Sequence, residues 1–435
     1  MGQGMTRSSR SAPQRVSAQI EAWCGGSTAV LLTLFTVALV ARLGAIFLVP
    51  APDLSPNAVE AYIGGAHKIV EGTGFRDPSY PLFTPPLCAL LIAIGIELFG
   101  NDQWPIKIVQ GLADAGVVAI LYVVCCRIFG ARTGLLAGVL AALYPFTIYA
   151  ATYIGSETLF SFFLTAFVLC ALRAIESDRV AWHTAAGLAV GLATLTRGST
   201  QFFPLFWLPL LAFFHGISRR VVQRFAAFCA AFALAIAPWA IRNYLVTDQV
   251  IPVAMAGGLV ALDGSDEAFF TIPGRDDRLH QYYLRLQNER GIEFPTGHTT
   301  AKQWEAYYSR AALERYKIRW EEEPRSFPGF FALKFARLWY GTESGTHQGA
   351  ILAANALVYP VCLAGIALAW RRRVRGSLLL LLPIVYLVLL HTAMFSMFRY
   401  IVPVMPFLLA FGAYALTAAA EEVLLSRRAG ERAPA

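Results

Sequence analysis

The sequence predicts an all-α polytopic membrane protein with about ten transmembrane helices. Of its 435 residues, 57% are hydrophobic and 15% are charged, and the mean hydropathy is +0.53. The apolar residues form long uncharged runs, each near the roughly 20 residues that a bilayer-spanning helix needs. The formal charge of +8 comes from arginines in short loops between these runs. We therefore interpret it as a topology signal, and not as a surface for nucleic acid.

Ten of these runs are candidate spans. They cover residues 27–49, 105–126, 133–152, 157–175, 181–197, 200–215, 223–241, 350–370, 376–394 and 399–419. The first run follows Arg7, Arg10 and Arg15 and is too long for the core of a cleavable signal peptide. We expect it to be an uncleaved span that starts in the cytoplasm. No period of 20–50 residues recurs along the chain, which disfavours an inverted-repeat transporter.

An eleventh apolar run, from Tyr80 to Gly100, decides the predicted topology. If this run stays on the outer surface, every arginine-rich segment lies on the side of the amino terminus, as the positive-inside rule requires. Those segments are 127–132, 173–179, 219–224, 371–375 and the tail with Arg427, Arg428 and Arg432. If the run crosses the bilayer, all of them move outward. We therefore expect it to lie along the outer face.

This topology divides the chain into seven parts. We expect both termini on the cytoplasmic side and two long segments on the outer side. In order, the parts are a tail 1–26, the first span 27–49, an outer loop 50–104, a six-span core 105–241, an outer subdomain 242–349, three spans in 350–419 and a tail 420–435.

The two outer segments contain candidate interfacial helices. Apolar residues recur at three- and four-residue spacing from Asn57 to Glu71, and Pro85-Pro86 favours the start of a second helix. In the later segment, 302–320 predicts a polar helix and 327–340 an amphipathic one. On the latter, Lys334 and Arg337 share a face by their spacing, and we expect that face to be solvated.

Three acidic residues near the predicted outer face are candidates for chemistry. Asp53 and Glu60 lie in the first loop, and Glu157 follows a short outer turn at the start of a span. A structural alternative applies to Glu157, because Ser156-Glu157 can simply cap a helix. The functional interpretation is that Glu157 frames an outer-face site together with a first-loop acid.

Arginines form the second group of candidates. Arg197, Arg242 and Arg399 lie on the predicted outer face, where the positive-inside rule disfavours them. Snorkelling of the side chain to the lipid headgroups accounts for any one of them, whereas three together favour the binding of an anionic lipid phosphate.

Arg42 and Asp114 fall at similar depths within two spans. We predict that they pair, because an isolated charge at that depth costs a few kcal/mol.

Several other chemistries find no support in the sequence. The seven cysteines lie in or beside apolar runs without metal-ligand spacing, so we interpret them as structural thiols. The chain contains no HExxH, GxSxG or Walker-type motif. Hydrolases and nucleotide-driven pumps are therefore disfavoured, and no motif assigns a cofactor or metal.

Short motifs along the chain resemble the polyprenyl-phosphate-dependent glycosyltransferases of the C superfamily, in particular bacterial relatives of protein mannosyltransferases and lipid A aminoarabinose transferases. The resemblance runs from about Arg42 to Pro406, and the order and spacing of the motifs carry it. The motifs are Ala61-Tyr62, Gly72-Thr-Gly-Phe75, Pro85-Pro-Leu87, Leu98-Phe-Gly100, Tyr144-Pro145, Ser156-Glu157, Gly191-Leu-Ala-Thr-Leu-Thr-Arg197, Pro238-Trp239, Arg242-Asn243-Tyr244 and Arg399-Tyr400.

This resemblance implies an inverting transfer of a sugar from a polyprenyl-phosphate carrier to a lipid, glycan or protein acceptor at the periplasmic face. A first-loop acid would act as general base, and basic residues would hold the departing phosphate. A divalent metal is compatible with it. Ala58 stands where family members usually carry an aspartate. Glu60 is the first candidate for the base and Asp53 the second.

The same resemblance assigns the remaining site residues. Glu157 matches the second acidic position of the family. The residues implied in binding substrate or phosphate are Arg42, Tyr62, Arg197, Arg242 and Arg399. A transporter or flippase of lipid-linked sugar is the alternative function, and the charges of Arg42 and Asp114 inside the membrane keep it open.

Overall fold

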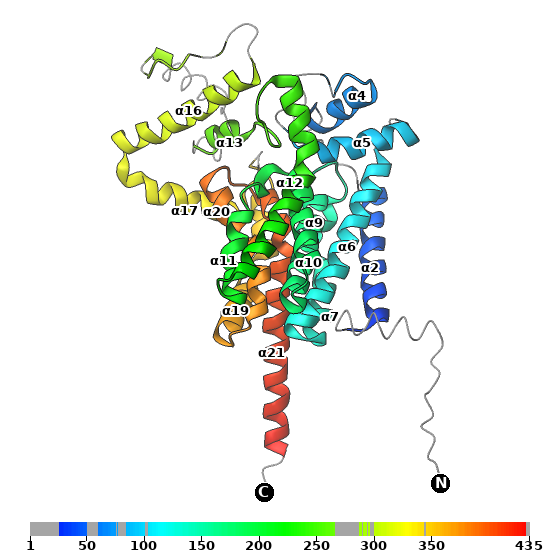
Figure 1. Ribbon diagram of the computed structural model, residues 1–435. Coiled ribbons are helices and arrows are strands. Elements are labelled where there is room, and N and C mark those ends of the chain that lie inside the picture. Colours follow the sequence, from blue (N-terminus) through cyan, green and yellow to red (C-terminus); the bar gives the residue numbers. More distant parts are fainter. Residues whose placement is uncertain are drawn as a thin grey trace.

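The computed structural model describes residues 26–49, 60–74, 76, 84–100, 103–265, 287–288, 290–293, 295, 300–342 and 345–431. Within these residues all regular secondary structure is helical. Long helices run side by side as a bundle, and shorter helices gather at one end of it (Figure 1). The predicted all-α polytopic membrane fold is confirmed.

Six helical segments of the described chain are long and apolar enough to cross a bilayer. They are Thr28–Leu48 (α2), Trp104–Phe129 (α6), Glu157–Ser177 (α9), Arg219–Thr247 (α12), Arg375–Ala393, which includes α20 (Leu378–Ala393), and Phe398–Ser426, which includes most of α21 (Met405–Glu431). The pair α18 (Gln348–Asn355) and α19 (Val358–Arg371), whose axes differ by 45°, is a seventh candidate if the two helices form one broken span. The expected count of ten is therefore not confirmed.

The remaining predicted spans are shorter helices of the same bundle. They are Ala131–Ala142 (α7), Val180–Thr196 (α10) and Pro204–His215 (α11). The continuous helix expected over 133–152 is broken, because α7 ends at Ala142 and Pro145 begins a separate helix, Pro145–Ala150 (α8). Proline lacks the amide hydrogen that a continuing helix needs, but it fits the first turn of a new one.

The bundle is held together by close approach of its helices. A Cβ atom added to Gly187 of α10 would lie 2.1 Å from the Phe228 carbonyl oxygen of α12, and one on Gly365 of α19 would lie 1.9 Å from that of Phe411 in α21. Neither position has room for a side chain. Such small-residue contacts let helix backbones meet where lipid supplies no hydrophobic driving force between helices.

One end of the bundle, which we call the basic end, collects the arginine-rich turns. Helix α2 begins there and α21 ends there (Figure 1). Ion pairs join neighbouring elements at this end: Arg127 with Glu176, Arg132 with Glu421, Arg372 with Glu422, and Arg224 with Asp178. The arginine-rich loops thus share one end of the molecule, as the sequence predicts.

The opposite end carries the first-loop helices. A π-helical turn, Glu60–Gly64 (η1), leads into Gly65–Val70 (α4), and Pro86–Phe99 (α5) follows. Helix α5 lies across the end of the bundle and not along it (Figure 1). A buried cluster joins it to α4, α6 and the turn before α9, and contains Ala66, Ile92, Ala93, Ile106 and Ile154. The run that includes α5 therefore packs as a surface helix, as the topology argument requires.

Three further helices lie at the same end. They are Gly257–Asp263 (α13), Ala301–Glu322 (α16) and Phe327–Arg337 (α17) (Figure 1). The helices expected over 302–320 and 327–340 are confirmed, and Thr300 with Gln303 forms a capping box at the start of α16. Helix α13 was not expected. It packs so closely on α16 that a Cβ atom on Gly258 would lie 2.8 Å from the Ser309 backbone nitrogen.

One prediction about α17 is wrong. Lys334 and Arg337 do share a face, but that face is buried: the two residues are 0% and 3% exposed. Helix α17 turns its basic face toward the end of α20 and toward α13, whereas residues such as Phe335 stay exposed. An amphipathic pattern shows that two faces differ, and tertiary packing decides which of them meets protein.

Candidate functional site

The centre of the candidate site is an arginine and a glutamate from neighbouring helices, at the end of the bundle opposite the basic end. Glu157 begins α9, and Arg197 directly follows α10. The Arg197 Nη2 atom lies 3.6 Å from the Glu157 Oε1 atom, and the two side chains are 15% and 7% exposed. Arg197 Nη1 is buried without a hydrogen-bond partner among the described residues. A buried guanidinium donor without a partner is costly, and is therefore suited to an anionic oxygen.

The turn before α9 aims the glutamate. The Gln110 side chain of α6 accepts a hydrogen bond from the Gly155 amide at 3.3 Å and donates one to the Tyr153 carbonyl at 2.7 Å. A Cβ atom on Gly155 would lie 2.4 Å from Glu157 Oε2. A larger residue at this position would therefore displace the carboxylate or the neighbouring Tyr153 ring. Ser156 precedes the helix, but its side chain makes no capping bond, whereas Glu157 lies in the first turn, where a carboxylate stabilises the helix dipole.

The segment after α20 supplies an aromatic wall. Tyr400 belongs to a short 3₁₀ turn, Phe398–Tyr400 (η5), and the Arg197 guanidinium lies 4.6 Å from its ring centroid. The His391 ring stacks on Tyr400, with the two ring centroids 4.5 Å apart. Arg399 is exposed, lies 5.2 Å from the same ring and donates from Nη2 to the Tyr400 hydroxyl at 3.4 Å. Two of the predicted arginines thus meet around Tyr400.

Two tyrosines complete the surroundings of Glu157. Burial, with Cys88 and Glu157 nearby, raises the pKa of Tyr62 to about 12, while a side-chain hydrogen bond with Ser156 and the charge of Arg197 oppose the shift. Burial and Glu157 raise the pKa of Tyr153 well above its ordinary value, against the charges of Arg399 and Arg197. Both phenols therefore stay neutral at physiological pH and can donate a hydrogen bond, but neither can serve as a base.

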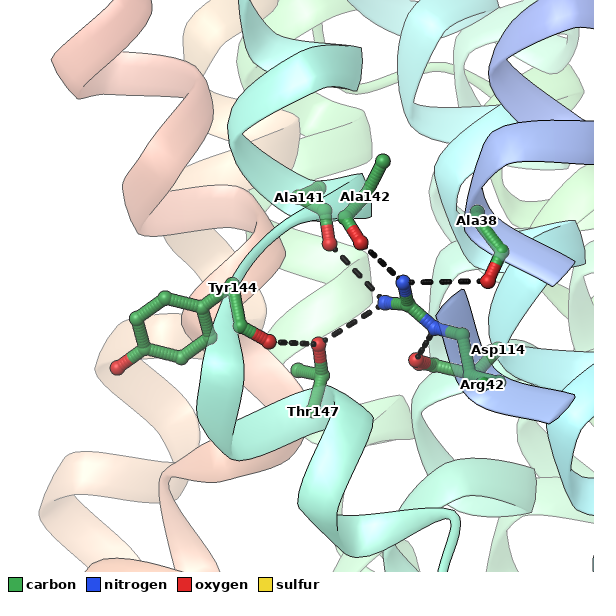
Figure 2. Close-up of polar contacts among 7 residues, drawn as sticks. All are labelled: Ala38, Arg42, Asp114, Ala141, Ala142, Tyr144 and Thr147. Carbon is green, nitrogen blue, oxygen red and sulfur yellow. Dashed lines mark hydrogen bonds and ion pairs between the residues drawn. The ribbon is translucent and has the colours of Figure 1, made fainter. Parts of the chain in front are cut away.

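Arg42 lies elsewhere, inside the bundle. Its Nε atom donates to Asp114 Oδ2 at 2.8 Å, as predicted, and the two side chains are 0% and 2% exposed. The other donors reach the carbonyl oxygens of Ala38, Ala141 and Ala142 and the hydroxyl of Thr147 (Figure 2). These bonds use all five N–H groups of a guanidinium. Arg42 therefore has no donor left for a substrate phosphate.

Arg242 also has partners within the protein. Its Nη2 atom donates to the Gly74 carbonyl at 2.6 Å and Nη1 donates to Asn243 Oδ1 at 3.1 Å, while Trp239 lies under the guanidinium at 5.0 Å. These contacts tie α12 to the turn that follows α4. The structure thus places Arg242 as a link to the first loop, and not beside Arg197.

The two candidate acids of the first loop lie at or beyond the edge of the described residues. Asp53 lies outside the described residues, and for Glu60 the structure describes only the backbone, which begins η1 two residues before Tyr62. Within the described part of the chain, no group of three or more histidine, cysteine, aspartate or glutamate residues is arranged to hold a metal ion. Glu157 is the candidate acid whose surroundings can be described.

Three contributors were missed by sequence reasoning. Gln110 and Tyr153 hold and flank the turn of Glu157, and His391 supports the Tyr400 ring. A glutamine one or two turns into an otherwise apolar span was the available signal for Gln110. No periodic signal could reveal His391, because its role depends on a residue in the next element.

Comparison with known proteins finds similarity to glycosyltransferases. Residues 84–241 match the family described as dolichyl-phosphate-mannose-protein mannosyltransferase. Two Bacillus subtilis (strain 168) proteins described as candidate mannosyltransferases, YycA and YkcB, are 28% identical over 137 residues and 26% identical over 113 residues. These alignments cover 32% and 26% of this chain, but only 20% and 16% of the relatives.

The fold is also found among solved structures. The archaeal oligosaccharyltransferase AglB from Archaeoglobus fulgidus, solved with an inhibitory peptide and a dolichol-phosphate, superposes with a TM-score of 0.54 at 14% identity. The match covers 94% of this chain and 52% of AglB, so the chain corresponds to about half of that protein. The family match and the two relatives support the resemblance to the glycosyltransferase C superfamily, and the chain shares its fold with AglB and has the helices of a multi-pass membrane protein.

Proposed function

We propose that the protein transfers a sugar from a polyprenyl-phosphate carrier to an acceptor hydroxyl at the periplasmic face of the inner membrane, with inversion at the anomeric carbon. The observation that carries this proposal is the Nη1 atom of Arg197, which has no hydrogen-bond partner among the described residues and belongs to a guanidinium held between Glu157 and the Tyr400 ring. The relatives and the AglB complex support a lipid-phosphate donor.

The arginines of the cluster suit the phosphate side of such a transfer. Arg197 would bind an oxygen of the departing phosphate, and Arg399, which is exposed next to Tyr400, would neutralise further negative charge. The acceptor oxygen would attack the anomeric carbon while the bond to the phosphate oxygen breaks. A carboxylate would take the acceptor proton, so that the lipid leaves as a phosphate.

The first loop would supply that carboxylate. Tyr62 lies within electrostatic reach of Glu157 and Arg197, and Glu60 is two residues before it in η1. Glu60 is our first candidate for the base and Asp53 the second, whereas Glu157 would orient Arg197 and compensate its charge. Arg42, whose donors are all used within the bundle, is left out of the proposed ligand set.

A lipid flippase is less well supported. The argument for it was the charge of Arg42 and Asp114 within the membrane, and these two residues neutralise each other in a fully buried pair. A transport pathway needs ionisable groups that face a cavity. The pair instead links α2, α6 and the end of α7, as a structural contact would.

The test is transfer from a defined polyprenyl-phosphate sugar in liposomes. We expect Glu60→Gln to lower the turnover about 100- to 10,000-fold, as the loss of a general base does, and Glu157→Gln to act mainly on the donor KM. Asp53→Asn is the matched alternative, and Glu97→Gln on the exposed side of α5 is the control. Full turnover in the Glu60, Asp53 and Glu157 variants would refute the assignment.

A further inference from the structure

Lys334 of α17 is a buried cation whose surroundings differ from those of an ordinary lysine. The residue is 0% exposed. Its Nζ atom donates to the carbonyl oxygens of Met394 at 2.6 Å, Gly264 at 2.8 Å and Ala393 at 2.9 Å. The Tyr316 hydroxyl lies at 3.3 Å. Three carbonyl oxygens match the three donors of an ammonium group, so the cation is satisfied by backbone alone.

Aromatic rings and a second cation surround the same atom. Nζ lies 5.2 Å from the ring centroid of Phe330 and 5.5 Å from that of Phe331. The second cation is Arg319 of α16, whose guanidinium lies 4.2 Å from the centroid of the same Phe330 ring. Burial, followed by the charge of Arg319, lowers the pKa of Lys334 to about 7. Burial of this cation carries a desolvation cost, which its contacts with the three carbonyl oxygens offset.

These contacts join elements that lie far apart in the chain. Gly264 directly follows α13, whereas Ala393 and Met394 form the corner where α20 ends. The two segments touch so closely that a Cβ atom on Gly264 would lie 1.7 Å from the Met394 oxygen. Lys334 thus binds both sides of this contact and fixes α17 against them.

The corner held by Lys334 leads directly into the candidate site. The Ser396 hydroxyl donates to the His391 carbonyl at 2.7 Å, and the Phe398 amide donates to the Gly341 carbonyl at 2.8 Å. Phe395 and Met397 pack with Phe330 in a buried cluster that also contacts Tyr400. Six residues beyond Met394, Tyr400 meets the Arg197 guanidinium. Buried side chains therefore connect the corner held by Lys334 to the Tyr400 ring.

We propose that Lys334 is a positioning residue for donor binding, which sets Tyr400 and Arg399 against Arg197 by holding the corner at Ala393–Met394. This inference rests on the proposed transferase function. It assigns the helices of the 242–349 segment a role in the site without placing any of them in contact with the substrate. A purely structural lysine would instead change the amount of folded protein and leave the donor KM of the folded fraction unchanged.

The experiment compares Lys334→Met with Lys317→Met in the full chain in liposomes. Lys317 lies on the exposed side of α16 and, among the described residues, pairs with Glu314, so its variant controls for the loss of a lysine. We expect Lys334→Met to raise the donor KM at least about tenfold per folded protein, with the acceptor KM changed less than about twofold. Hydrogen exchange of the 394–400 amides should accelerate in Lys334→Met alone.

The possible results separate the two proposals. Transfer with an unchanged donor KM, or unchanged exchange at 394–400, overturns the role of Lys334 and leaves the proposed function standing. Failure of the wild-type protein to transfer from any polyprenyl-phosphate sugar overturns the proposed function, and this inference with it. If Lys334→Met does not fold, Lys334→Gln, which keeps two N–H donors, decides between the same outcomes.

Discussion

The Arg197 Nη2 atom lies 3.6 Å from the Glu157 Oε1 atom, and the same guanidinium stacks 4.6 Å from the ring centroid of Tyr400. The first distance is too long for a hydrogen bond, so the carboxylate attracts the cation without using up its donors. The ring restricts the plane of the guanidinium. Together these neighbours orient Arg197 and leave Nη1 without a partner among the described residues.

Replacing Arg197 should therefore weaken donor binding more than folding. We expect Arg197→Lys, which keeps the charge but loses the planar fork, to reduce kcat/KM about 10- to 100-fold. Liposome transfer kinetics with a defined donor measure this. Arg242→Lys, in which the altered guanidinium holds Gly74 and not the Arg197 cluster, serves as the comparison. Equal losses in both variants would contradict a special role for Arg197.

Gly155→Ala should displace the Glu157 carboxylate. The added Cβ atom would lie 2.4 Å from Glu157 Oε2 and 2.8 Å from the Tyr153 ring, so one of these groups must move. We expect transfer to fall at least about tenfold while the protein remains folded. Gly95→Ala on α5 is the control, because nothing lies within 4 Å of its Cβ position. Normal transfer by Gly155→Ala would show that the carboxylate need not fold over the turn.

The Arg42–Asp114 pair should be structural. Arg42→Leu leaves Asp114 buried without its partner, and we expect a loss of about 3–5 kcal/mol in the free energy of unfolding. Arg42→Leu combined with Asp114→Leu should be less damaging than Arg42→Leu alone, because no unpaired charge remains. Thermal unfolding in detergent and liposome transfer together measure this. A double variant that is stable but inactive would instead make Arg42 a substrate ligand.

The stability of the protein should depend on pH through Lys334. Burial lowers its pKa in the folded state to about 7, whereas an unfolded lysine has a pKa near 10.4. Between these values the unfolded chain binds more protons, so the free energy of unfolding should rise with pH, by at most about 1.4 kcal/mol per pH unit. Below about pH 7 the contribution should be constant.

The difference between wild type and Lys334→Met isolates this contribution. Denaturant unfolding in detergent from about pH 6 to pH 10 should give curves that diverge only above about pH 7. Parallel curves across the whole range would mean that Lys334 keeps an ordinary pKa. That result would leave its contacts intact, because they rest on geometry.

The two ends of the bundle should face opposite sides of the membrane. Glu97 on α5 and Glu421 at the basic end are both exposed. In a chain without other cysteines, a membrane-impermeant thiol reagent added outside should label Glu97→Cys and not Glu421→Cys. Labelling of both from one side would refute the predicted position of α5 on the outer face.

The sequence by itself determined the class of the protein and the outline of its fold. Long apolar runs and arginine-rich turns predict a bundle with one basic end, because burial in lipid and the positive-inside bias act on local composition. The matching depths of Arg42 and Asp114 predicted their pair for the same reason. The arginine and the glutamate at the centre of the site were also named from sequence, through outward position and family resemblance.

Only the tertiary structure decided which of these residues meet. Residue order does not show that the Tyr400 ring packs on the Arg197 guanidinium. Nor does it show that Arg242 donates to the Gly74 carbonyl, or that Arg42 donates to carbonyl oxygens inside the bundle. Lys334 is a second example. Its spacing in the sequence suits a solvated helix face, but in the fold the ends of α13 and α20 pack against it. Local composition sets where a segment lies, but a site depends on contacts between segments that are distant in the chain, and these exist only once the bundle has packed.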